Sequence, residues 1–229
     1  MVAERGCNMP WYDGPTLLET LESLQPANTA SALPFRLPVQ LVQRTAGERA
    51  YLGRIQSGCV RIGDELIVLP SERRVTVSGV RTNGGASGAA LAGDSVALTL
   101  AEETDIGRGD LLADAEQPPR VSQVVDATLI WLSAQPLVEG GRYLLKHAAR
   151  TVRAKLTAAT ERVDVQTLAV LPAPGRIGLN DIVRVKLAVQ QPVAIDAYEK
   201  NRAAGAFILI DESTNHTIAG GMAFISGRG

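Results

Sequence analysis

The chain contains only two histidines and two cysteines, and the spacing of its chemically reactive residue types matches no recognised active site. The two histidines, His147 and His216, lie in stretches typical of strands or turns, with no serine or cysteine nucleophile motif nearby. We therefore predict polar surface positions for both instead of roles as catalytic bases. Cys59 lies in a hairpin-like stretch, Ser57-Gly58-Cys59-Val60, which favours a small buried thiol over a reactive one.

Three further patterns can be compared with a phosphate-binding loop, a nucleic-acid groove and a carboxylate site, and none of them matches fully. The glycine-rich run Asn83–Gly88 (NGGASG) lacks the Gly-Lys-Ser/Thr ending of a phosphate-binding loop and no helix pattern follows it, so we expect a flexible hairpin loop. Arginine predominates over acidic residues between Arg36 and Arg81, but Tyr51 is the one aromatic residue among them, so the stretch lacks the interleaved aromatics that base stacking needs. Carboxylates are scattered without a spacing that suggests an acid–base pair or a metal cluster. We predict no catalytic, cofactor-binding or metal-binding residues in this chain.

Composition is that of an ordinary globular protein. The 229 residues are 45% hydrophobic and 21% charged, and the formal net charge of -1 gives no global attraction to nucleic acid or membrane. The two cysteines, Cys7 and Cys59, are far apart and fit neither a disulfide scaffold nor a zinc site. No apolar run is long enough to span a bilayer and the first residues lack a signal-peptide core, so we predict a cytoplasmic location.

The beginning of the chain predicts one short helix. Thr16 and Glu19 fit a capping box, in which both side chains satisfy backbone groups of the first helical turn. Four leucines then fall on one face (Leu17, Leu18, Leu21 and Leu24), and Pro26 ends the pattern. A helix this short is marginal in water by itself, so we expect its leucines to cover a barrel surface or a neighbouring molecule.

The rest of the chain reads as β-strands. Apolar and polar residues alternate from Phe35 to Val42, which predicts a strand with one buried face. Gly63-Asp64, Gly93-Asp94 and Gly109-Asp110 each precede apolar residues and indicate turns that lead into strands. The two prolines of Gln117–Arg120 (QPPR) predict a linker, because proline cannot lie in a central strand.

A second β block follows the linker. Alternation recurs at 152–156 and 183–190, and the continuous apolar run Phe207–Ile210 is typical of a strand that is covered on both sides. We therefore predict an all-β fold of two antiparallel β-barrels preceded by a short N-terminal helix.

Several stretches resemble elongation-factor-type GTPases. Asn8–Glu19 (NMPWYDGPTLLE) looks like the last segment of their GTP-binding domain. Gly53–Gly58 (GRIQSG) and Ile62–Glu65 (IGDE) look like the first β-barrel that follows it, as do Ala92–Leu98 (AGDSVAL) and Asp105–Asp110 (DIGRGD). These motifs are shared across the translation-factor superfamily, where the two barrels are the domain 2-like and domain 3-like modules.

The second β block resembles one particular family within this superfamily. It is similar to the large, GTP-binding subunit of bacterial sulfate adenylyltransferase at Arg142–Lys146 (RYLLK), Arg162–Leu168 (RVDVQTL), Leu179–Ile182 (LNDI) and Asn201–Asp211 (NRAAGAFILID). The run that ends at Asp211 is the most specific of these. Together the matches cover nearly the whole chain.

This resemblance implies a large subunit with a GTPase domain followed by two β-barrels. Such a subunit pairs with a smaller catalytic subunit, a nucleotidyltransferase that adenylylates sulfate with ATP, and GTP hydrolysis drives that step of sulfate assimilation and cysteine biosynthesis. In some members an adenylylsulfate kinase domain is fused behind the barrels. GTP and Mg²⁺ are then expected with the GTPase domain and not with the barrels.

The P-loop, the switch regions and the guanine-recognition element of that family have no counterpart in this sequence. We therefore expect residues 1–30 to be the tail and last helix of a missing GTPase domain, residues 31–117 the first β-barrel, and residues 118–229 the second. The leading hypothesis is a non-catalytic barrel portion whose partners are the small catalytic subunit and the GTPase domain, with no membrane partner. The alternative is a translation-factor-like module that binds RNA or the ribosome. The sequence favours this nucleic-acid-binding role less than the leading hypothesis.

Overall fold

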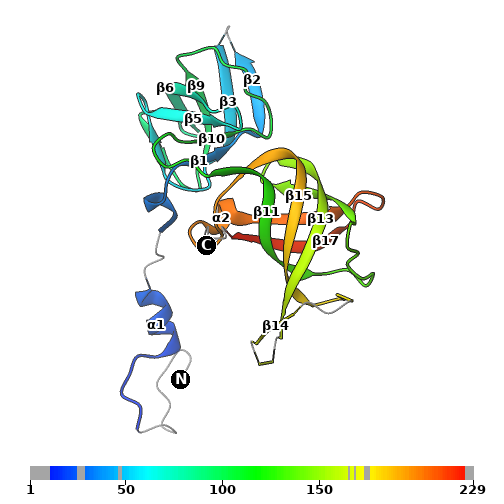
Figure 1. The fold of residues 1–229 in the computed structure, drawn as a ribbon. Coiled ribbons are helices and arrows are strands. Elements are labelled where there is room, and N and C mark those ends of the chain that lie inside the picture. The colour runs from blue at the N-terminus through cyan, green and yellow to red at the C-terminus, as the bar shows by residue number, and fades with distance from the viewer. Residues whose placement is uncertain are drawn as a thin grey trace.

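The protein is built almost entirely of antiparallel β-strands (Figure 1). The computed structural model describes residues 11–24, 29–45, 48–164, 166–167, 169–172 and 176–224. Strands form two successive units with separate cores, and one short helix, α1 (Leu17–Ser23), precedes them. The predicted all-β fold of two antiparallel barrels is confirmed, and only the second barrel is a fully closed ladder of strands.

The first unit, which we call the half-barrel, follows a single-turn 3₁₀ helix (Thr29–Ala32). Its main sheet has the strand order β1-β10-β5-β6-β9-β3-β2, with β7 paired to β6, and β4 pairs with β8 beside it. A bridge between Arg36 and Ser57 brings β1 against the chain that follows β3. The strands are β1 (Arg36–Pro38), β2 (Leu41–Thr45), β3 (Glu48–Arg54), β4 (Cys59–Arg61), β5 (Glu65–Leu69), β6 (Arg73–Thr82), β7 (Gly85–Ser87), β8 (Ala89–Leu91), β9 (Ser95–Leu100) and β10 (Leu111–Asp114).

The second unit, which we call the closed barrel, has the strand order β12-β16-β17-β11-β15-β13, and β12 pairs with β13 to close it. The short strand β14 adds to the outer end of β13. A one-turn helix, α2 (Arg202–Gly205), leads into β16. The strands are β11 (Arg120–Trp131), β12 (Arg142–His147), β13 (Arg150–Val163), β14 (Val170–Pro172), β15 (Ile182–Ile195), β16 (Ala206–Asp211) and β17 (Thr217–Phe224).

The predicted Gly-Asp turns share one geometry. In each, the glycine has a positive φ, between 93° and 98°, and the aspartate carboxylate accepts a hydrogen bond from the backbone N–H three residues earlier, at 2.7–2.9 Å. Asn180-Asp181 repeats this turn in the closed barrel, with Asn180 at φ 67° in place of glycine. The turns position β5, β9, β10 and β15, so the prediction of turns that lead into strands is confirmed.

The first predicted strand is wrong in two details. The alternation from Phe35 to Val42 splits into β1 and β2, and Leu41 is 54% exposed although it was expected to face the core. Between the two strands, the backbone N–H groups of Val39 and Gln40 donate to different neighbours, Asp110 and Leu52, so the chain changes partner strand there. Arg36, expected to face solvent, is 3% exposed because it lies at the contact with the closed barrel.

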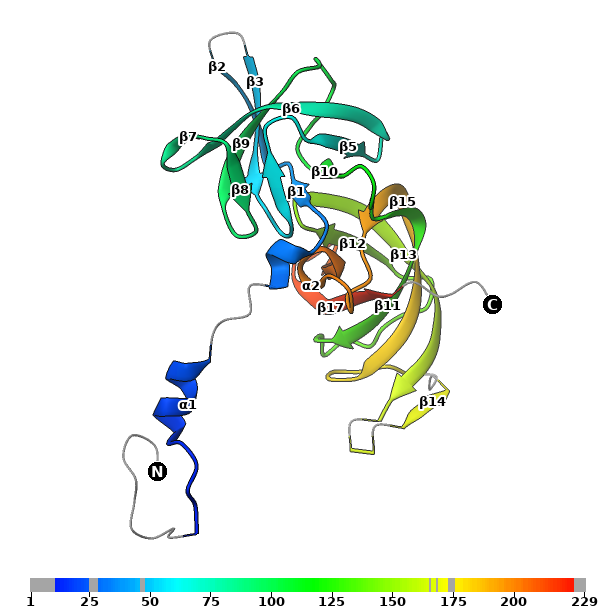
Figure 2. The same ribbon diagram turned by 90° about the vertical axis from the view of Figure 1, so that its left-hand side faces the viewer.

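The helix α1 lies apart from both sheets in the two views (Figures 1 and 2). The predicted capping box is present, since Thr16 Oγ1 accepts from the Glu19 N–H and the Glu19 carboxylate accepts from the Thr16 N–H. Its four leucines are between 43% and 62% exposed, so the expectation that they cover a barrel surface is wrong. Cover by a neighbouring molecule stays a prediction. None of the helices in the described residues has the length and apolar character needed to cross a membrane.

The two sheets occupy residues 36–114 and 120–224, with the proline-containing linker between them. The assignment of residues 1–30, 31–117 and 118–229 to three domains stays a prediction.

Candidate functional site: the outer groove and the joint between the barrels

Both histidines belong to the closed barrel, whereas Cys59 belongs to the half-barrel. His216 is exposed, as predicted, but His147 is 5% exposed and the prediction of a surface position is wrong for it. Cys59, predicted to be buried, is exposed at the start of β4. Strand alternation explains the error at Cys59, because Val60, its neighbour, takes the inward position in this three-residue strand.

His147 is held as a structural side chain of the closed barrel. Its Nε2 lies 2.9 Å from the carbonyl oxygen of Ala204, which can only accept, so the neutral ring carries its proton on Nε2. Burial lowers the pKa of His147, and the Ala204 carbonyl and the Asp196 charge oppose this shift. The imidazole therefore stays neutral at pH 7 and joins β12 to α2.

The other candidate patterns do not come together around a reacting centre. Asn83–Gly88 forms the end of a hairpin in which β7 pairs with β6, Thr82 opposite Gly85. Among the residues that the structure describes, no group of three or more His, Cys, Asp or Glu side chains could hold a metal ion. The predicted absence of catalytic, cofactor-binding and metal-binding residues stays a prediction.

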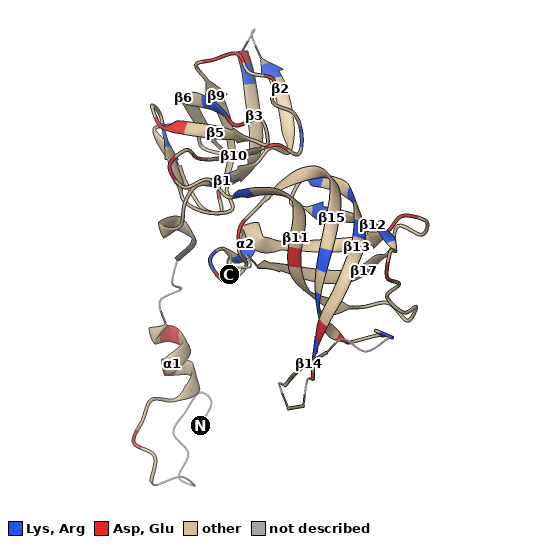
Figure 3. Cartoon of the chain, viewed as in Figure 1, with Lys and Arg blue, Asp and Glu red and all other residues tan. Residues whose placement is uncertain are grey.

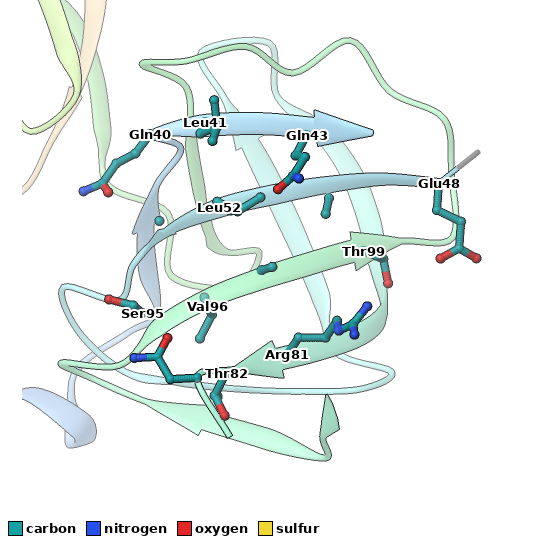
Figure 4. Close-up of a pocket in the computed structure, with 14 residues that line it drawn as sticks. Gln40, Leu41, Gln43, Glu48, Leu52, Arg81, Thr82, Ser95, Val96 and Thr99 are labelled. Atoms are coloured by element: carbon teal, nitrogen blue, oxygen red, sulfur yellow. The ribbon is translucent and has the colours of Figure 1, made fainter. Parts of the chain in front are cut away.

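A groove of about 570 Å³ lies on the outer face of the half-barrel (Figure 4). Its floor is formed by small or apolar residues of β3 and β9, including Ala50, Leu52 and Ala97. Its rim consists of neutral hydrogen-bonding side chains with one guanidinium and one carboxylate: Gln40, Gln43, Thr82, Asn83, Ser95, Thr99, Arg81 and Glu48. Amides and hydroxyls of this kind suit an uncharged polar ligand or a peptide segment better than a metal or a polyphosphate.

Two glycines in the first half-barrel motif bring its strands close together. A Cβ atom on Gly53 would lie 2.3 Å from the carbonyl oxygen of Pro38, so only glycine lets β3 pass beneath the break between β1 and β2. Gly58 has φ 78°, and a Cβ there would lie 2.5 Å from the Cα of Phe35. This motif therefore sets the packing of β1, the strand in which Arg36 contacts the closed barrel.

The arginines between Arg36 and Arg81 do not line one groove. Arg81 is the only one of them on the outer groove. Arg74 pairs with Glu65 on the neighbouring strand, and Arg54 donates to the carbonyl oxygen of Gly93 at 3.1 Å. The arginine excess in this region is divided among separate faces, so it does not form a continuous cationic track.

Arg36 is the centre of the contact between the two units, which we call the joint. Its guanidinium donates from Nε to Asp196 Oδ2 at 2.8 Å and from Nη2 to Asp196 Oδ1 at 3.1 Å. The remaining donors reach the carbonyl oxygens of Phe35 and Gln117, both at 2.8 Å. A bidentate ion pair with every nitrogen satisfied fixes both distance and orientation.

Asn201 extends the joint from the start of α2. Its Nδ2 donates to Ser57 Oγ of the half-barrel at 2.9 Å, and Ser57 in turn donates to the carbonyl oxygen of Pro34 at 2.7 Å. Asn201 Oδ1 accepts the N–H of Ala204 at 3.2 Å and so caps α2. Asn201 is 5% exposed and Ser57 is fully buried, so this network is protected from water.

Apolar residues and a second ion pair complete the joint. Leu69, Leu111 and Ala113 of the half-barrel form one buried cluster with Ala194 of the closed barrel. Beside this cluster, Arg150 lies 3.5 Å from Asp110, an aspartate of one of the Gly-Asp turns. The joint therefore combines buried ionic, neutral polar and apolar contacts, and its buried, mutually satisfied hydrogen bonds favour one relative arrangement of the two units.

Comparison with known proteins bears on both units. Residues 124–223 match the family described as GTP-eEF1A C-terminal domain-like. Sulfate adenylyltransferase subunit 1 of Shewanella oneidensis is 40% identical over 232 residues, which is 99% of this chain and 48% of that protein. The bifunctional enzyme CysN/CysC of Rhodopirellula baltica is 40% identical over 222 residues, covering 96% of this chain and 34% of that protein.

This chain is a relative of sulfate adenylyltransferase subunit 1. It spans from about a third to half of the length of the curated relatives that it matches. The resemblance found in the sequence is therefore confirmed, and so is its position within the translation-factor superfamily.

The solved structures show the same fold. A structure described as Sup35 complexed with GDP superposes with a TM-score of 0.79 at 21% identity and covers 94% of this chain and 53% of that one. The corresponding structure with GMPPNP gives a TM-score of 0.78 at 21% identity. The fold of both units is thus shared in outline with a much more distant protein.

Proposed function

We propose that this chain is the barrel portion of a sulfate adenylyltransferase large subunit and that it transmits domain movement to a small catalytic subunit. The supporting observation is the 40% identity to subunit 1 proteins over 93% and 99% of this chain. The printed description of these relatives as subunit 1 fits an enzyme with at least one further subunit, and we assign the adenylylation of sulfate with ATP to that partner.

The joint supports a mechanical role. A movement passed from one side of the molecule to the other must not be lost in bending between the half-barrel and the closed barrel. Arg36, Asp196 and Asn201 hold the two units through bonds that are buried and mutually satisfied. We infer that the two units move together as one rigid body when either of them is displaced.

The proposal assigns GTP and Mg²⁺ to a separate GTPase domain. The two Sup35 structures are described as complexes with GDP and with GMPPNP, and this chain covers only 53% and 52% of those chains. In calorimetry at micromolar protein, we expect no saturable heat when GTP is added to this chain. Saturable GTP binding would contradict this assignment.

Co-elution tests the proposed partner. The chain is mixed with the purified small subunit of sulfate adenylyltransferase from the same source and separated by size exclusion at low and physiological salt. We expect one complex peak that contains both proteins. Separate elution of both proteins at 100 µM of each, an order of magnitude above weak functional affinities, would overturn the proposal. Salt-sensitive tRNA binding without small-subunit binding would instead support the RNA-binding alternative.

The cytoplasmic location remains a prediction from the sequence. It agrees with the proposed role in sulfate assimilation.

A further inference from the structure

The outer surface of the closed barrel carries a row of apolar side chains, at positions where a sheet that faces solvent usually has polar ones. Along β16, Phe207 and Leu209 point into the core, whereas Ile208 and Ile210 point outward and are only half-buried. The sequence predicted a strand covered on both sides, but β16 faces the core on one side only, so that prediction is wrong for this structure. The outward isoleucines lie in the run most characteristic of the sulfate adenylyltransferase resemblance.

Strand register places this apolar surface in one line across four neighbouring strands. Lys146 of β12 lies opposite Ile208 of β16, Ile208 opposite Gly220 of β17, and Gly220 opposite Ile130 of β11. Leu144 lies opposite Ile210 in the adjacent row, so the two rows form a continuous patch. Ile130 is 37% exposed, and Leu144, Ile208 and Ile210 are partly exposed, so a partner can reach the patch most directly at Ile130.

Gly220 makes a depression in the middle of this patch. A Cβ atom built on Gly220 would meet nothing within 4 Å, so the space above it is open. Its neighbour Gly221 faces inward, where a Cβ would lie 2.3 Å from the Phe207 ring. A glycine weakens a strand, and Gly221 is required by the ring, whereas nothing among the residues that the structure describes requires Gly220. A shallow hollow between two isoleucines suits an apolar side chain from another molecule.

Cationic side chains border the patch on β12 and β13 (Figure 3). Arg142 and Lys155 are directly opposite each other in the ladder, which is unfavourable for like charges, and Lys146 follows on the same face. Among the described residues none of these three forms an ion pair, although the adjacent Arg153 pairs with Glu212 at 2.8 Å. A hollow of about 490 Å³ is lined by Arg142, Lys155 and Gln190 together with the Arg153–Glu212 ion pair. An anionic group here would relieve the repulsion between the two opposed cations.

We propose that this outer face binds a partner protein whose contact surface has an apolar centre and an acidic rim. The docking face comprises Leu144, Ile208, Ile210, Gly220 and Ile130, with Arg142, Lys146 and Lys155 as its cationic border. An apolar centre with a charged rim is the anatomy of a protein–protein interface. Nucleic acid fits less well, because the apolar rows offer nothing to phosphates and contain no aromatic side chain for stacking.

This inference rests on the proposed function for the identity of the partner, which is the small subunit. The test is calorimetric titration of that subunit into the wild-type chain and into Gly220→Glu and Lys155→Glu. Glutamate at 220 fits sterically but places a charge in the apolar row, and we expect the Kd to rise at least about tenfold. Lys155→Glu should raise the Kd by about threefold to tenfold at low salt and by less at high salt.

The matched control is Ala86→Glu, which adds the same charge at an exposed position of β7 on the half-barrel. Its Kd should equal that of the wild type, and circular dichroism melting should confirm that all variants are folded. Equal small-subunit binding by wild type and Gly220→Glu would overturn the docking face and leave the proposed function standing. Failure of the wild type to bind would overturn the proposed function itself. Binding of tRNA that is lost in Lys155→Glu and kept in Gly220→Glu would assign the cations to nucleic acid and contradict the inference.

Discussion

The half-barrel and the closed barrel use the same inward pattern of apolar residues but differ in what they present outward. The outer groove of the half-barrel has neutral amide and hydroxyl side chains at its rim, such as Gln43 and Asn83. The closed barrel instead presents isoleucines beside Arg142, Lys146 and Lys155, which form no ion pair within the described part of the chain. Because the inner faces are alike, the difference between the two units lies in the outward residues, and these must determine which molecules each unit contacts.

Between these two outer surfaces lies the joint, where the only deeply buried ion pair of the described residues is found. Arg36 is 3% exposed and Asp196 15%, whereas the arginine of every other described ion pair to which an arginine contributes is at least 19% exposed. The joint is therefore the region where a substitution should affect both units. The outer faces should tolerate substitution with little effect on stability.

The largest expected effect is at the joint itself. Arg36→Ala leaves Asp196 partly buried without its cation and leaves the Phe35 and Gln117 carbonyl groups without their donor. We expect the free energy of unfolding to fall by about 3–5 kcal/mol, measured by chemical denaturation. Arg74→Ala, which removes an exposed pair with Glu65, is the matched control and should cost less than about 1 kcal/mol. Equal losses in both variants would contradict the special role of the joint.

The two adjacent glycines of β17 should respond in opposite directions. Gly221→Ala places a methyl group against the Phe207 ring and should cost about 1–3 kcal/mol. Gly220→Ala meets no neighbouring atom and should raise stability by about 0.5–1 kcal/mol, because alanine loses less backbone entropy. Thermal unfolding of the two variants checks this contrast, and a similar shift in both would show that Gly220 does not face open space.

The burial of His147 in the closed barrel predicts that the free energy of unfolding depends on pH. Burial lowers its pKa in the folded state, so as the pH falls below the ordinary value of 6.5 the unfolded chain takes up a proton that the folded chain does not. The resulting stability loss should approach about 1.4 kcal/mol per pH unit below that value. Unfolding free energies at pH 7.5 and 5.5 measure it. In His147→Gln this part of the pH dependence should disappear, and an unchanged profile would refute the assignment.

The smallest effect concerns the cationic border of the docking face. Lys155→Glu replaces a like-charged pair with an opposite-charged pair across from Arg142, and should stabilise the isolated chain by about 0.2–1 kcal/mol. The same substitution should weaken small-subunit binding, so stability and binding move in opposite directions. Loss of stability in the isolated chain would show that Lys155 already has a favourable partner.

Local patterns predicted most of the fold. The three Gly-Asp pairs specified their turns because glycine supplies the positive φ and the aspartate side chain caps the turn within three residues. The capping box of α1 was equally predictable from Thr16 and Glu19. Alternation at 152–156 and 183–190 also identified the inward faces of β13 and β15, since each face depends only on strand period.

Burial that depends on distant partners was not predictable from the sequence. Arg36 is buried because Asp196, 160 residues away, approaches it, and no local signal marks that pairing. His147 is buried because α2 places the Ala204 carbonyl against it. The apolar run Phe207–Ile210 was correctly identified as unusual, but alternation alone could not show that its second face looks away from the core.

The central claim is that the joint makes the half-barrel and the closed barrel one rigid body. Residual dipolar couplings of backbone N–H groups in both units test it most directly, with Arg36→Ala as the comparison. The account predicts that couplings from both units of the wild type fit a single alignment tensor and that the variant needs two. Two different tensors for the wild-type chain would show that its units reorient independently and would contradict the account.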